Sequence, residues 1–241
     1  MQGTLWRMAT KPSPLLCELH AHTTWSDGAF SVRGLCDLYG RNGFDVLAVT
    51  DHSLRTPGFV DRSTFDAYRD EIDAEAERAR RLYGLLVLPG VELTYDDPDP
   101  TEAAHAVALG LRSYVAVAEG VETMLRAARA HGAALVAAHP YPADEAETSP
   151  RRTARFAADH ARLGPLVDRF ELFNRHTLFS WVADAGLPTV ATGDFHRYEH
   201  LAGWKTMLPC AKTEEAVIGY LRSPRPAYLV RLDERPKLRA A

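Results

Sequence analysis

Polar and apolar positions recur in the same order several times along the chain. An amphipathic stretch is followed by a glycine, a short apolar run and then one or two histidine or carboxylate side chains. The apolar runs lie at residues 44–49, 85–88, 133–138 and 187–192, after Gly43, Gly84, Gly132 and Gly186. A glycine after a helix can take the left-handed conformation that ends it, and a short apolar run is typical of a strand buried on both faces. The repeated unit is therefore a helix, a glycine, a buried strand and a polar residue.

Helical periodicity predicts the helices that separate these strands. Phe65, Tyr68 and Ile72 share one face of a helix that should run to about residue 83. Ser63 is expected to cap this helix, with Asp66 three positions later completing a capping box. Further helices are expected at residues 32–41, 119–131, 153–162, 176–185 and 213–221.

The alternation of strands and helices indicates an α/β fold with a mainly parallel sheet. A closed or nearly closed β/α barrel is favoured over an open sheet, because no glycine-rich phosphate loop follows the first strand. Residues 15–241 are expected to form a single domain behind an N-terminal extension of residues 1–14, and residues 96–100 should form a loop.

Composition narrows the class of protein. The chain of 241 residues is 46% hydrophobic and 25% charged, which is typical of a globular protein and excludes intrinsic disorder. Its 28 basic and 32 acidic side chains give a net charge of −4, so no stable nucleic-acid partner is expected. No apolar run suits a membrane helix or a signal peptide, so we expect no membrane partner and a cytoplasmic location. Three scattered cysteines without a CxxC pair indicate neither a disulfide framework nor a thiolate zinc site.

Histidine and carboxylate side chains gather at the expected C-terminal ends of the strands, where a β/α barrel collects its active-site groups. The set is His20, His22, Asp27, Asp51, His52, Glu92, His105, His139, Asp194 and His196. Because residues i and i+2 of a strand face the same side, His20 is expected beside His22. Asp194 and His196 are expected side by side as well if the chain stays extended. Two such pairs could share metal ions.

Each of these histidines, taken alone, is more readily explained as a hydrogen-bonded structural residue. Six of the ten histidines, however, fall at strand ends on one face of the expected barrel. Burying so many imidazoles and carboxylates without ions would cost several kcal/mol for each charged group, so the metal interpretation is preferred. The other four are expected in helices or loops at the surface, namely His131, His160, His176 and His200.

Seven segments, taken in order, carry a family resemblance. They are Glu18–Thr23 (ELHAHT), Ser26–Gly28 (SDG), Thr50–His52 (TDH), Gly90–Glu92 (GVE), His105, His139-Pro140 and Asp194–His196 (DFH). Over residues 15–197 they resemble the motifs of the PHP superfamily, the polymerase and histidinol phosphatase type of metal-dependent phosphoesterases. Glu18 departs from the aspartate usual before the first motif, which leaves the metal-binding histidines intact. Asp27 resembles a branch in which aspartate replaces a histidine ligand, and that branch includes nucleotide phosphatases and small-RNA exonucleases.

The resemblance implies a distorted (β/α)7 barrel that holds two or three divalent transition-metal ions, whether manganese, iron or zinc. One ion would be held by His20, His22, Glu92 and Asp194, a second by Glu92, His105 and His139, and a third by Asp27, His52 and His196. In such a trinuclear centre the bridging water or hydroxide would be the nucleophile, and Glu92, Asp194 and His196 would be catalytic. Three carboxylates contribute about −3 and the ions about +4 to +6, so the pocket floor would attract a phosphate.

Four further residues are candidates for supporting roles. Asp51 is expected either to orient a metal ligand such as His52 or to cap the following turn. Arg55, Arg175 and Arg197 each follow a strand-end residue closely, so each is a candidate for binding a substrate phosphate, the alternative being a surface salt bridge. Arg197 is the first choice because it adjoins His196, although the loop must turn there for its side chain to enter the pocket.

Two rival functions remain open. Amidohydrolase-type barrels also begin with HxH, but many of them need a lysine at a strand end, and the lysines here are Lys11, Lys205, Lys212 and Lys237. Hydrolysis of a non-phosphate ester, amide or carbamate is therefore the alternative reaction, and a non-catalytic PHP-type binding module is the alternative without chemistry. Fold and metal centre do not choose among phosphate esters. The expected substrate is a small phosphomonoester or a nucleotide. A small substrate is favoured, because the stretch between His52 and Glu92 is mostly one helix, whereas the family resemblance implies a larger inserted segment in relatives that act on nucleotides.

Overall fold

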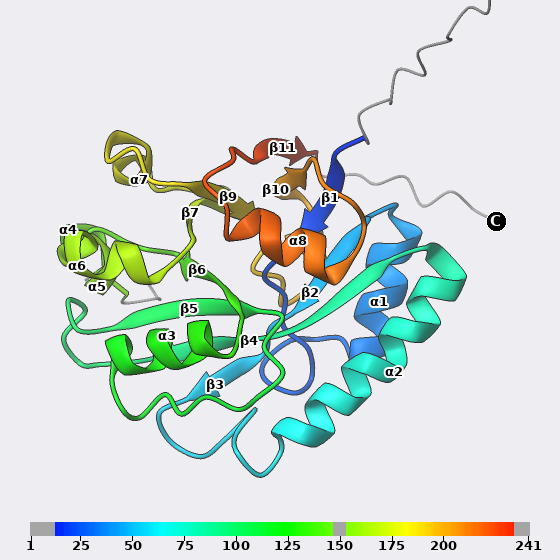
Figure 1. Ribbon diagram of the computed structural model, residues 1–241, viewed down its shortest axis with the longest axis horizontal. Helices are drawn as coiled ribbons and strands as arrows, with labels where there is room; N and C mark the ends of the chain where they lie inside the picture. The colour runs from blue at the N-terminus through cyan, green and yellow to red at the C-terminus, as the bar shows by residue number, and fades with distance from the viewer. Residues whose placement is uncertain (1–12, 147–152, 234–241) are drawn as a thin grey trace, which may run out of the picture.

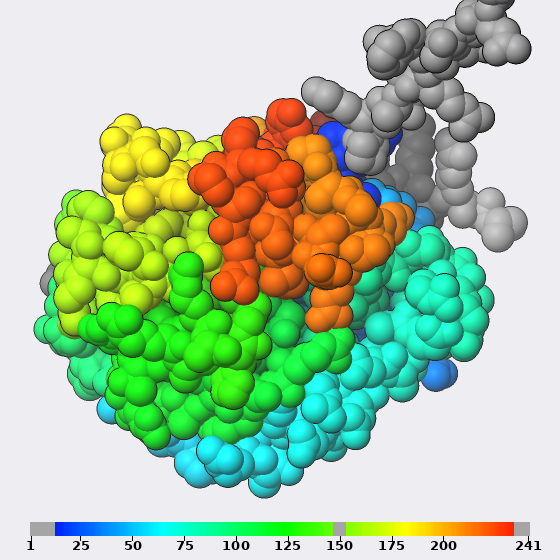
Figure 2. Space-filling view, viewed as in Figure 1, coloured from blue at the N-terminus to red at the C-terminus, as the bar shows by residue number. Residues whose placement is uncertain are grey.

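A computed structural model describes residues 13–146 and 153–233 (Figure 1). Most of the expected N-terminal extension, residues 1–12, and the end of the expected domain, residues 234–241, lie outside the described residues. The fold is a mixed α/β arrangement in which helices pack on the outside of one curled sheet. Figure 2 shows the face covered by α2, α3 and α8. Among the described residues, no helix has both the length and the apolarity to span a membrane.

The strands follow the expected apolar runs but are more numerous. They are β1 Leu15–Glu18, β2 Val46–Val49, β3 His52–Leu54, β4 Leu86–Tyr95, β5 Ala104–Leu109, β6 Ala134–Ala138, β7 Arg169–Asn174, β8 Thr177–Leu178, β9 Thr189–Thr192, β10 Gly203–Leu208 and β11 Tyr228–Leu232. Their order in the sheet is β11-β10-β1-β2-β4-β5-β6-β7-β8, with β3 beside β4 and β9 beside β7. All residues of β2, β5 and β6 are buried, as expected for strands covered on both faces.

The helices agree with the predicted positions to different degrees. They are α1 Val32–Arg41, α2 Phe65–Tyr83, α3 Val121–Ala130, α4 Ala143–Ala146, α5 Arg155–Ala158, α6 His160–Leu163, α7 Ser180–Asp184 and α8 Glu214–Leu221, with 3-10 turns at Gly164–Leu166 and Tyr198–Leu201. The predicted helix at 153–162 is broken at Asp159, whose φ of −133° is not helical. The predicted helix at 176–185 begins only at Ser180, because residues 174–177 form the tight turn that joins β7 to β8.

The predicted capping box of α2 is wrong. The residue before the helix is Thr64, which makes no capping hydrogen bond with its side chain. The Ser63 hydroxyl instead donates to Asp61 Oδ1 at 2.6 Å, and the same carboxylate accepts the backbone N–H of Ser63 and Thr64. The Asp61 side chain, one turn before the helix, thus accepts the hydrogen bonds that order the backbone at the start of α2.

The sheet is more mixed than the mainly parallel sheet that was predicted. Strands β1, β2 and β4 pair in parallel, as do β6, β7 and β9, but β5 is antiparallel to both β4 and β6. The reason is local: the expected loop at 96–100 returns the chain from β4 to β5 without a helix, and such a connection reverses the strand. Strand β10 is likewise antiparallel to β1 and β11.

The curl of the sheet brings its two distant ends together. Ala21, after β1, forms a parallel bridge with Phe195, after β9. The Thr206 side chain on β10 accepts the Ala191 N–H at 2.9 Å and donates to the Ala191 carbonyl at 2.7 Å, so it joins β10 to β9. Residues 18–22 and 193–196 therefore lie side by side although they are far apart in the sequence.

Candidate metal centre

The first side-chain cluster lies where the ends of β1 and β9 meet the middle of β4. His20 Nε2 and His22 Nε2 lie 3.4 Å and 3.5 Å from Glu92 Oε2. Asp194 Oδ1 completes the cluster at 3.7 Å from His20 Nε2 and 3.4 Å from His22 Nε2. Asp194 has a φ of +42°, so the chain turns sharply at this residue. All four side chains are buried.

The second cluster shares Glu92 with the first. Glu92 Oε1 lies 3.1 Å from His105 Nδ1 and 3.0 Å from His139 Nε2. The antiparallel strand β5 carries His105, which is paired with Thr94 of β4 and with Ala138 of β6. The two oxygens of one buried carboxylate thus face two separate groups of histidines, which is the geometry of a bridging ligand.

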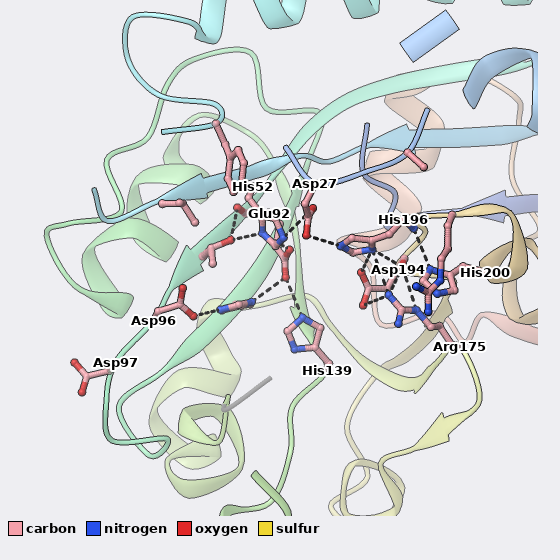
Figure 3. Close-up of a pocket in the computed structure, with 16 residues that line it drawn as sticks. Asp27, His52, Glu92, Asp96, Asp97, His139, Arg175, Asp194, His196 and His200 are labelled. Atoms are coloured by element: carbon pink, nitrogen blue, oxygen red, sulfur yellow. Dashed lines mark hydrogen bonds and ion pairs between the residues drawn. The ribbon is translucent and has the colours of Figure 1, made fainter. Parts of the chain in front are cut away.

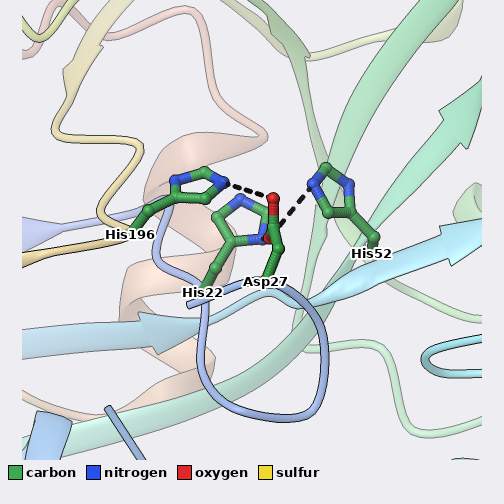
Figure 4. A group of neighbouring side chains, drawn as sticks. All are labelled: His22, Asp27, His52 and His196. Carbon is green, nitrogen blue, oxygen red and sulfur yellow. Dashed lines mark ion pairs between the residues drawn. The ribbon is translucent and has the colours of Figure 1, made fainter. Parts of the chain in front are cut away.

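The third cluster is nearest to solvent and is drawn in Figure 4. Asp27 Oδ1 lies 3.6 Å from His52 Nε2, and Asp27 Oδ2 lies 3.2 Å from His196 Nε2. His22 also reaches this cluster, since its Nδ1 lies 3.8 Å from Asp27 Oδ1. Ligand-type atoms of these four residues all lie within 4.8 Å of one another, as do those of His20, His22 and Glu92, and those of Glu92, His105 and His139.

Outer hydrogen bonds fix which ring nitrogen of several histidines faces the centre. The Glu171 carboxylate, 2.9 Å from His20 Nδ1, can only accept, so Nδ1 carries a proton and Nε2 is the ring nitrogen that faces the centre. The His52 Nδ1 atom lies 2.8 Å from the Thr94 hydroxyl and 2.8 Å from Glu92 Oε2, while its Nε2 faces Asp27. His139 Nδ1 faces Thr153 Oγ1 at 3.1 Å. These are the arrangements that orient imidazoles toward a metal ion.

His105 uses the opposite nitrogen. Its Nε2 lies 2.9 Å from Asp96 Oδ1, and its Nδ1 lies 3.1 Å from the shared carboxylate of Glu92. Among the residues that the structure describes, the buried Nε2 atoms of His20 and His22 have no hydrogen-bond partner. Buried imidazole nitrogens without partners, close to carboxylates, are the donor set of divalent cations, so the residues present fit a metal centre.

The charges of the clusters are strongly coupled. Burial alone would lower the pKa of His105, but the Glu92 and Asp96 carboxylates raise it to about 9. Burial and the neighbouring imidazoles lower the pKa of His22 to about 3. Burial would raise the pKa of Glu92, yet the surrounding histidines, His52 first among them, hold it well below its usual range. Glu92 is therefore ionised near neutral pH and available to a cation.

Glu171 is a supporting residue that the sequence analysis missed. It is fully buried on β7 and accepts hydrogen bonds from Thr192 Oγ1 at 2.6 Å, Asn174 Nδ2 at 2.8 Å and the His139 backbone N–H at 2.6 Å, besides the one from His20. It therefore ties together residues of the first and second clusters. The available signal was a carboxylate inside an apolar strand, which requires partners when buried.

Asp51 does not contact His52 in the manner expected of an orienting residue. Its carboxylate accepts the Thr23 N–H at 2.7 Å, the Thr23 hydroxyl at 2.8 Å and the Ser26 hydroxyl at 2.6 Å. It thus holds the loop that carries Asp27. That loop folds back so closely on His22 that a side chain at Gly28 would collide with the His22 carbonyl.

A buried ion pair lies under the first cluster. Glu18 Oε2 lies 2.9 Å from Lys205 Nζ and accepts the Tyr39 hydroxyl at 3.0 Å. Glu18 Oε1 accepts the Gly193 N–H at 2.8 Å, which links the HxH segment to the segment before Asp194. Gly193 has no room for a Cβ, because Glu18 and Lys205 occupy that space. Lys205 is thus a structural partner beneath the centre.

The clusters form the floor of a cavity of about 930 Å³, shown in Figure 3. Arg175 lines it and donates to the Asp194 carbonyl at 2.7 Å, with the Asp194 carboxylate 3.3 Å away. Arg197 also lines the cavity and is 70% exposed. Arg55 does not line it, because its guanidinium lies over the Tyr95 ring and bonds to the Asp96 carbonyl and to Asp97.

The predicted surface histidines divide in two. His131, His160 and His176 are exposed, as predicted. His200 is half-buried and lines the cavity, where its Nδ1 accepts the His196 N–H at 3.1 Å, so its surface assignment was wrong. Burial and the nearby Arg175 lower the pKa of His200 to about 4, so it is neutral near pH 7.

We compared the sequence and the fold with those of known proteins. No family model matches the sequence. Part of the chain, 87 residues or 33% of it, is 39% identical to the DNA polymerase/3'-5' exonuclease PolX of Bacillus subtilis and covers only 15% of that protein. A crystal structure of a two-domain protein from Bacteroides vulgatus aligns with 91% of this chain over 65% of the length of the Bacteroides chain. The TM-score is 0.65 and the sequence identity is 18%. That protein is described as containing a predicted PHP-like metal-dependent phosphoesterase.

A crystal structure of a suspected metal-dependent phosphoesterase from Bifidobacterium adolescentis aligns with 75% of this chain over 87% of the length of the Bifidobacterium chain, with a TM-score of 0.49 and 17% sequence identity. Of these likenesses, the one to the Bacteroides protein is strong enough to identify the fold. The resemblance to PHP-type phosphoesterases that the ordered motifs predict is thus confirmed at the level of the fold.

Proposed function

We propose that the chain is a metal-dependent phosphoesterase that hydrolyses a small phosphomonoester or a nucleotide. The observation that carries this proposal is the convergence of histidine ring nitrogens on one buried carboxylate. His20 and His139 bond outward through Nδ1 and His105 through Nε2, and each directs its other ring nitrogen at Glu92. A purely structural cluster has no need of several imidazoles facing one buried carboxylate, whereas a polynuclear metal centre does.

The ligand sets follow the three clusters. His20, His22, Glu92 and Asp194 would hold one ion, and Glu92, His105 and His139 a second. Asp27, His52 and His196 would hold a third, with His22 close by. Nitrogen and carboxylate ligands of this kind suit manganese, iron or zinc. We place this centre in one domain of residues 15–241 built on a distorted (β/α)7 barrel.

When bound, divalent ions supply a water of lowered pKa as the nucleophile and stabilise the charge of a phosphoryl group. The residues of the chain fix the geometry around that chemistry. Glu92 and Asp194 both lie beside His22 in the first cluster, and His196 lies at the border of the third cluster and the open cavity. Arg197 and Arg175 stand where a guanidinium can bind non-bridging phosphate oxygens.

The test is a metal count followed by a substrate screen. Purified protein reconstituted separately with manganese, iron and zinc is expected to bind at least two ions per chain by elemental analysis. A saturating content of one ion would overturn the polynuclear centre. The loaded forms are then assayed on a panel of phosphomonoesters and nucleotides, with carboxylate esters, amides and carbamates beside them.

Hydrolysis of phosphate esters alone supports the proposal. Turnover confined to amides, carbamates or carboxylate esters would replace it with the amidohydrolase-type reaction. Full metal loading without turnover of any class in the panel would favour a binding module. His160→Ala, an exposed histidine remote from the cavity lining, is the control that should leave both metal content and turnover unchanged.

A further inference from the structure

The cavity is larger than a phosphate group requires. Its volume of about 930 Å³ is at the upper end of the range for sites that hold organic ligands. One part of its lining is cationic or hydrogen-bonding, formed by Arg175, Arg197 and His200. Another part is apolar, formed by Leu54 and Phe59 with Ala29. A substrate that fills this space has an organic portion as well as an anionic one.

Phe59 is the only aromatic residue of that apolar lining, and it is unusually exposed. Its relative exposure is 43%, one of the few large hydrophobic side chains in the described chain with such exposure. Its backbone has a φ of +52°, a left-handed conformation that is strained for a bulky side chain. Neither burial nor backbone preference therefore accounts for a phenylalanine at this position.

The backbone of Phe59 is nevertheless held firmly. Residue Ser53 forms an antiparallel bridge with Phe59, and the Val60 N–H donates to the His52 carbonyl at 3.1 Å. The Thr64 hydroxyl donates to the Phe59 carbonyl at 3.1 Å. The loop from 55 to 58 is thereby closed onto β3, and the backbone that carries the aromatic ring is fixed relative to the cavity floor.

The ring lies next to a residue of the third cluster. The Phe59 and His52 rings are stacked with centroids 6.1 Å apart and an interplanar angle of 29°. A phosphoester bound at the third cluster would have its ester oxygen, and the carbon group attached to it, close to Phe59. Aromatic rings stack with other flat rings at such distances, and the interaction adds to simple burial.

We propose that Phe59 is a specificity-determining residue that stacks on a planar ring in the alcohol portion of the substrate. This inference rests on the proposed phosphoesterase function and narrows it to phosphoesters in which a flat ring lies a short linker away from the phosphorus. Single exposed hydrophobic residues are common and need no explanation. Phe59 differs because it is strained, fixed, and stacked beside a cluster histidine at the cavity.

The test compares binding of phenylphosphonate and methylphosphonate, which keep the anionic group, lack a cleavable ester and differ in the ring. Calorimetry on the manganese-loaded protein is expected to give about tenfold tighter binding of phenylphosphonate. Phe59→Leu keeps an apolar side chain without the ring and is expected to reduce that ratio to about one, with methylphosphonate affinity unchanged. Tyr228→Leu is the matched control, because Tyr228 is an exposed aromatic residue on β11 outside the cavity lining.

Phe59→Gly is a second variant that removes the ring without adding backbone strain, so a loss of binding preference in it cannot be due to misfolding. Glycine tolerates a positive φ, so this variant should melt at the wild-type temperature or above it while losing the preference for phenylphosphonate. Equal affinity of the wild-type protein for the two phosphonates, no binding of either, or a retained preference in Phe59→Leu would each overturn the role of Phe59. Failure of the loaded enzyme to hydrolyse any phosphate ester, with the phosphonate preference intact, would instead overturn the phosphoesterase function.

Discussion

The floor and the rim of the cavity differ in how their side chains are held. On the floor, His20 and Glu92 are fully buried, lie on or next to strands, and have hydrogen-bond partners that fix their orientation. On the rim, Phe59 has a relative exposure of 43% and 70% of the Arg197 side chain is exposed, and both lie outside the helices and strands. The floor is therefore organised before any ligand arrives, whereas the rim can adjust.

This difference separates the two parts of the proposed function. Rigid strands fix the ligands that determine what chemistry is available, because metal sites tolerate little displacement of their ligands. Loops carry the groups that would distinguish one phosphate ester from another, as is common in β/α barrels. Variants of the floor should consequently affect metal content and turnover of every substrate, and variants of the rim should affect only some substrates.

The largest effect is expected from the shared ligand of the floor. Glu92→Ala removes the carboxylate between the first and second clusters, and Asp194→Ala removes the acid of the first. Each should abolish hydrolysis and lower the metal content, with circular dichroism unchanged. His160→Ala is the control, and an equal loss in all three variants would show that the floor is not the reacting part.

The next effect concerns stability. Lys205→Met leaves the Glu18 carboxylate buried without its counter-charge and should lower the free energy of unfolding by about 3–5 kcal/mol. Lys212→Met removes an exposed pair with Asp45 and should cost less than about 1 kcal/mol. Urea denaturation of both variants measures the difference. Equal stabilities would mean that the ion pair beneath the floor is not a structural requirement.

A smaller effect is expected from the positioning residue Glu171. Glu171→Gln keeps the size of the side chain but weakens the acceptor for His20 Nδ1–H, and it should lower metal affinity about 10–100-fold. The new amide also faces two of the four donors around Glu171, so the metal-free protein should melt at a lower temperature than wild type. Metal titration at a temperature where the variant is fully folded therefore measures the positioning role apart from stability. Glu199→Gln, on the exposed rim, should leave metal affinity at the wild-type value.

The three candidate arginines should respond differently to substitution by lysine, because they make different contacts. Arg197→Lys keeps the charge but loses two-pronged binding, so kcat/KM for a phosphate ester should fall about tenfold with metal content unchanged. Arg175→Lys should lower metal content as well, because Arg175 bonds to the Asp194 segment. Arg55→Lys should behave as wild type, and a loss there equal to that of Arg197→Lys would place Arg55 at the substrate after all.

The smallest effect lies away from the cavity, between α1 and α2. Arg78 lies 2.6 Å from Asp37 Oδ1 and also pairs with Glu75. Partial burial alone would raise the pKa of the Asp37 and Glu75 carboxyls, but the Arg78 guanidinium lowers the pKa of both. A lowered pKa stabilises the fold above the unfolded value of about 4, and this contribution disappears as the pH falls further. The stability difference between wild type and Arg78→Leu should be about 1 kcal/mol at pH 6 and shrink toward pH 3. A constant difference would contradict the ionic origin.

The floor was predictable from the sequence because its signals are local. His20 and His22 follow an apolar run at i and i+2 spacing, and a buried strand end needs no long-range information to be recognised. The same holds for α1, whose predicted and observed bounds coincide. Glu171 was missed because its role depends on partners as distant as His20, 151 positions away.

The rim was less predictable because side-chain direction in a loop depends on backbone turns. Arg55 was a candidate by its position after His52, yet the nearby Tyr95 ring and Asp97 carboxylate bind its guanidinium outside the cavity. His200 was expected at the surface, but the turn at Tyr198–Leu201 returns it to His196. Phe59 showed no pattern in the sequence, since a positive φ is visible only in the fold.

The pairing of β1 with β10 also has a consequence for how the chain is made. A ribosome releases the HxH segment long before Lys205, which follows Glu18 by 187 positions. Until Lys205 emerges, Glu18 has no counter-charge and β1 lacks one of its two neighbouring strands. The HxH segment of a nascent chain therefore waits for β10, and a chain released before residue 208 lacks this support beneath the candidate centre, however complete its own motifs are.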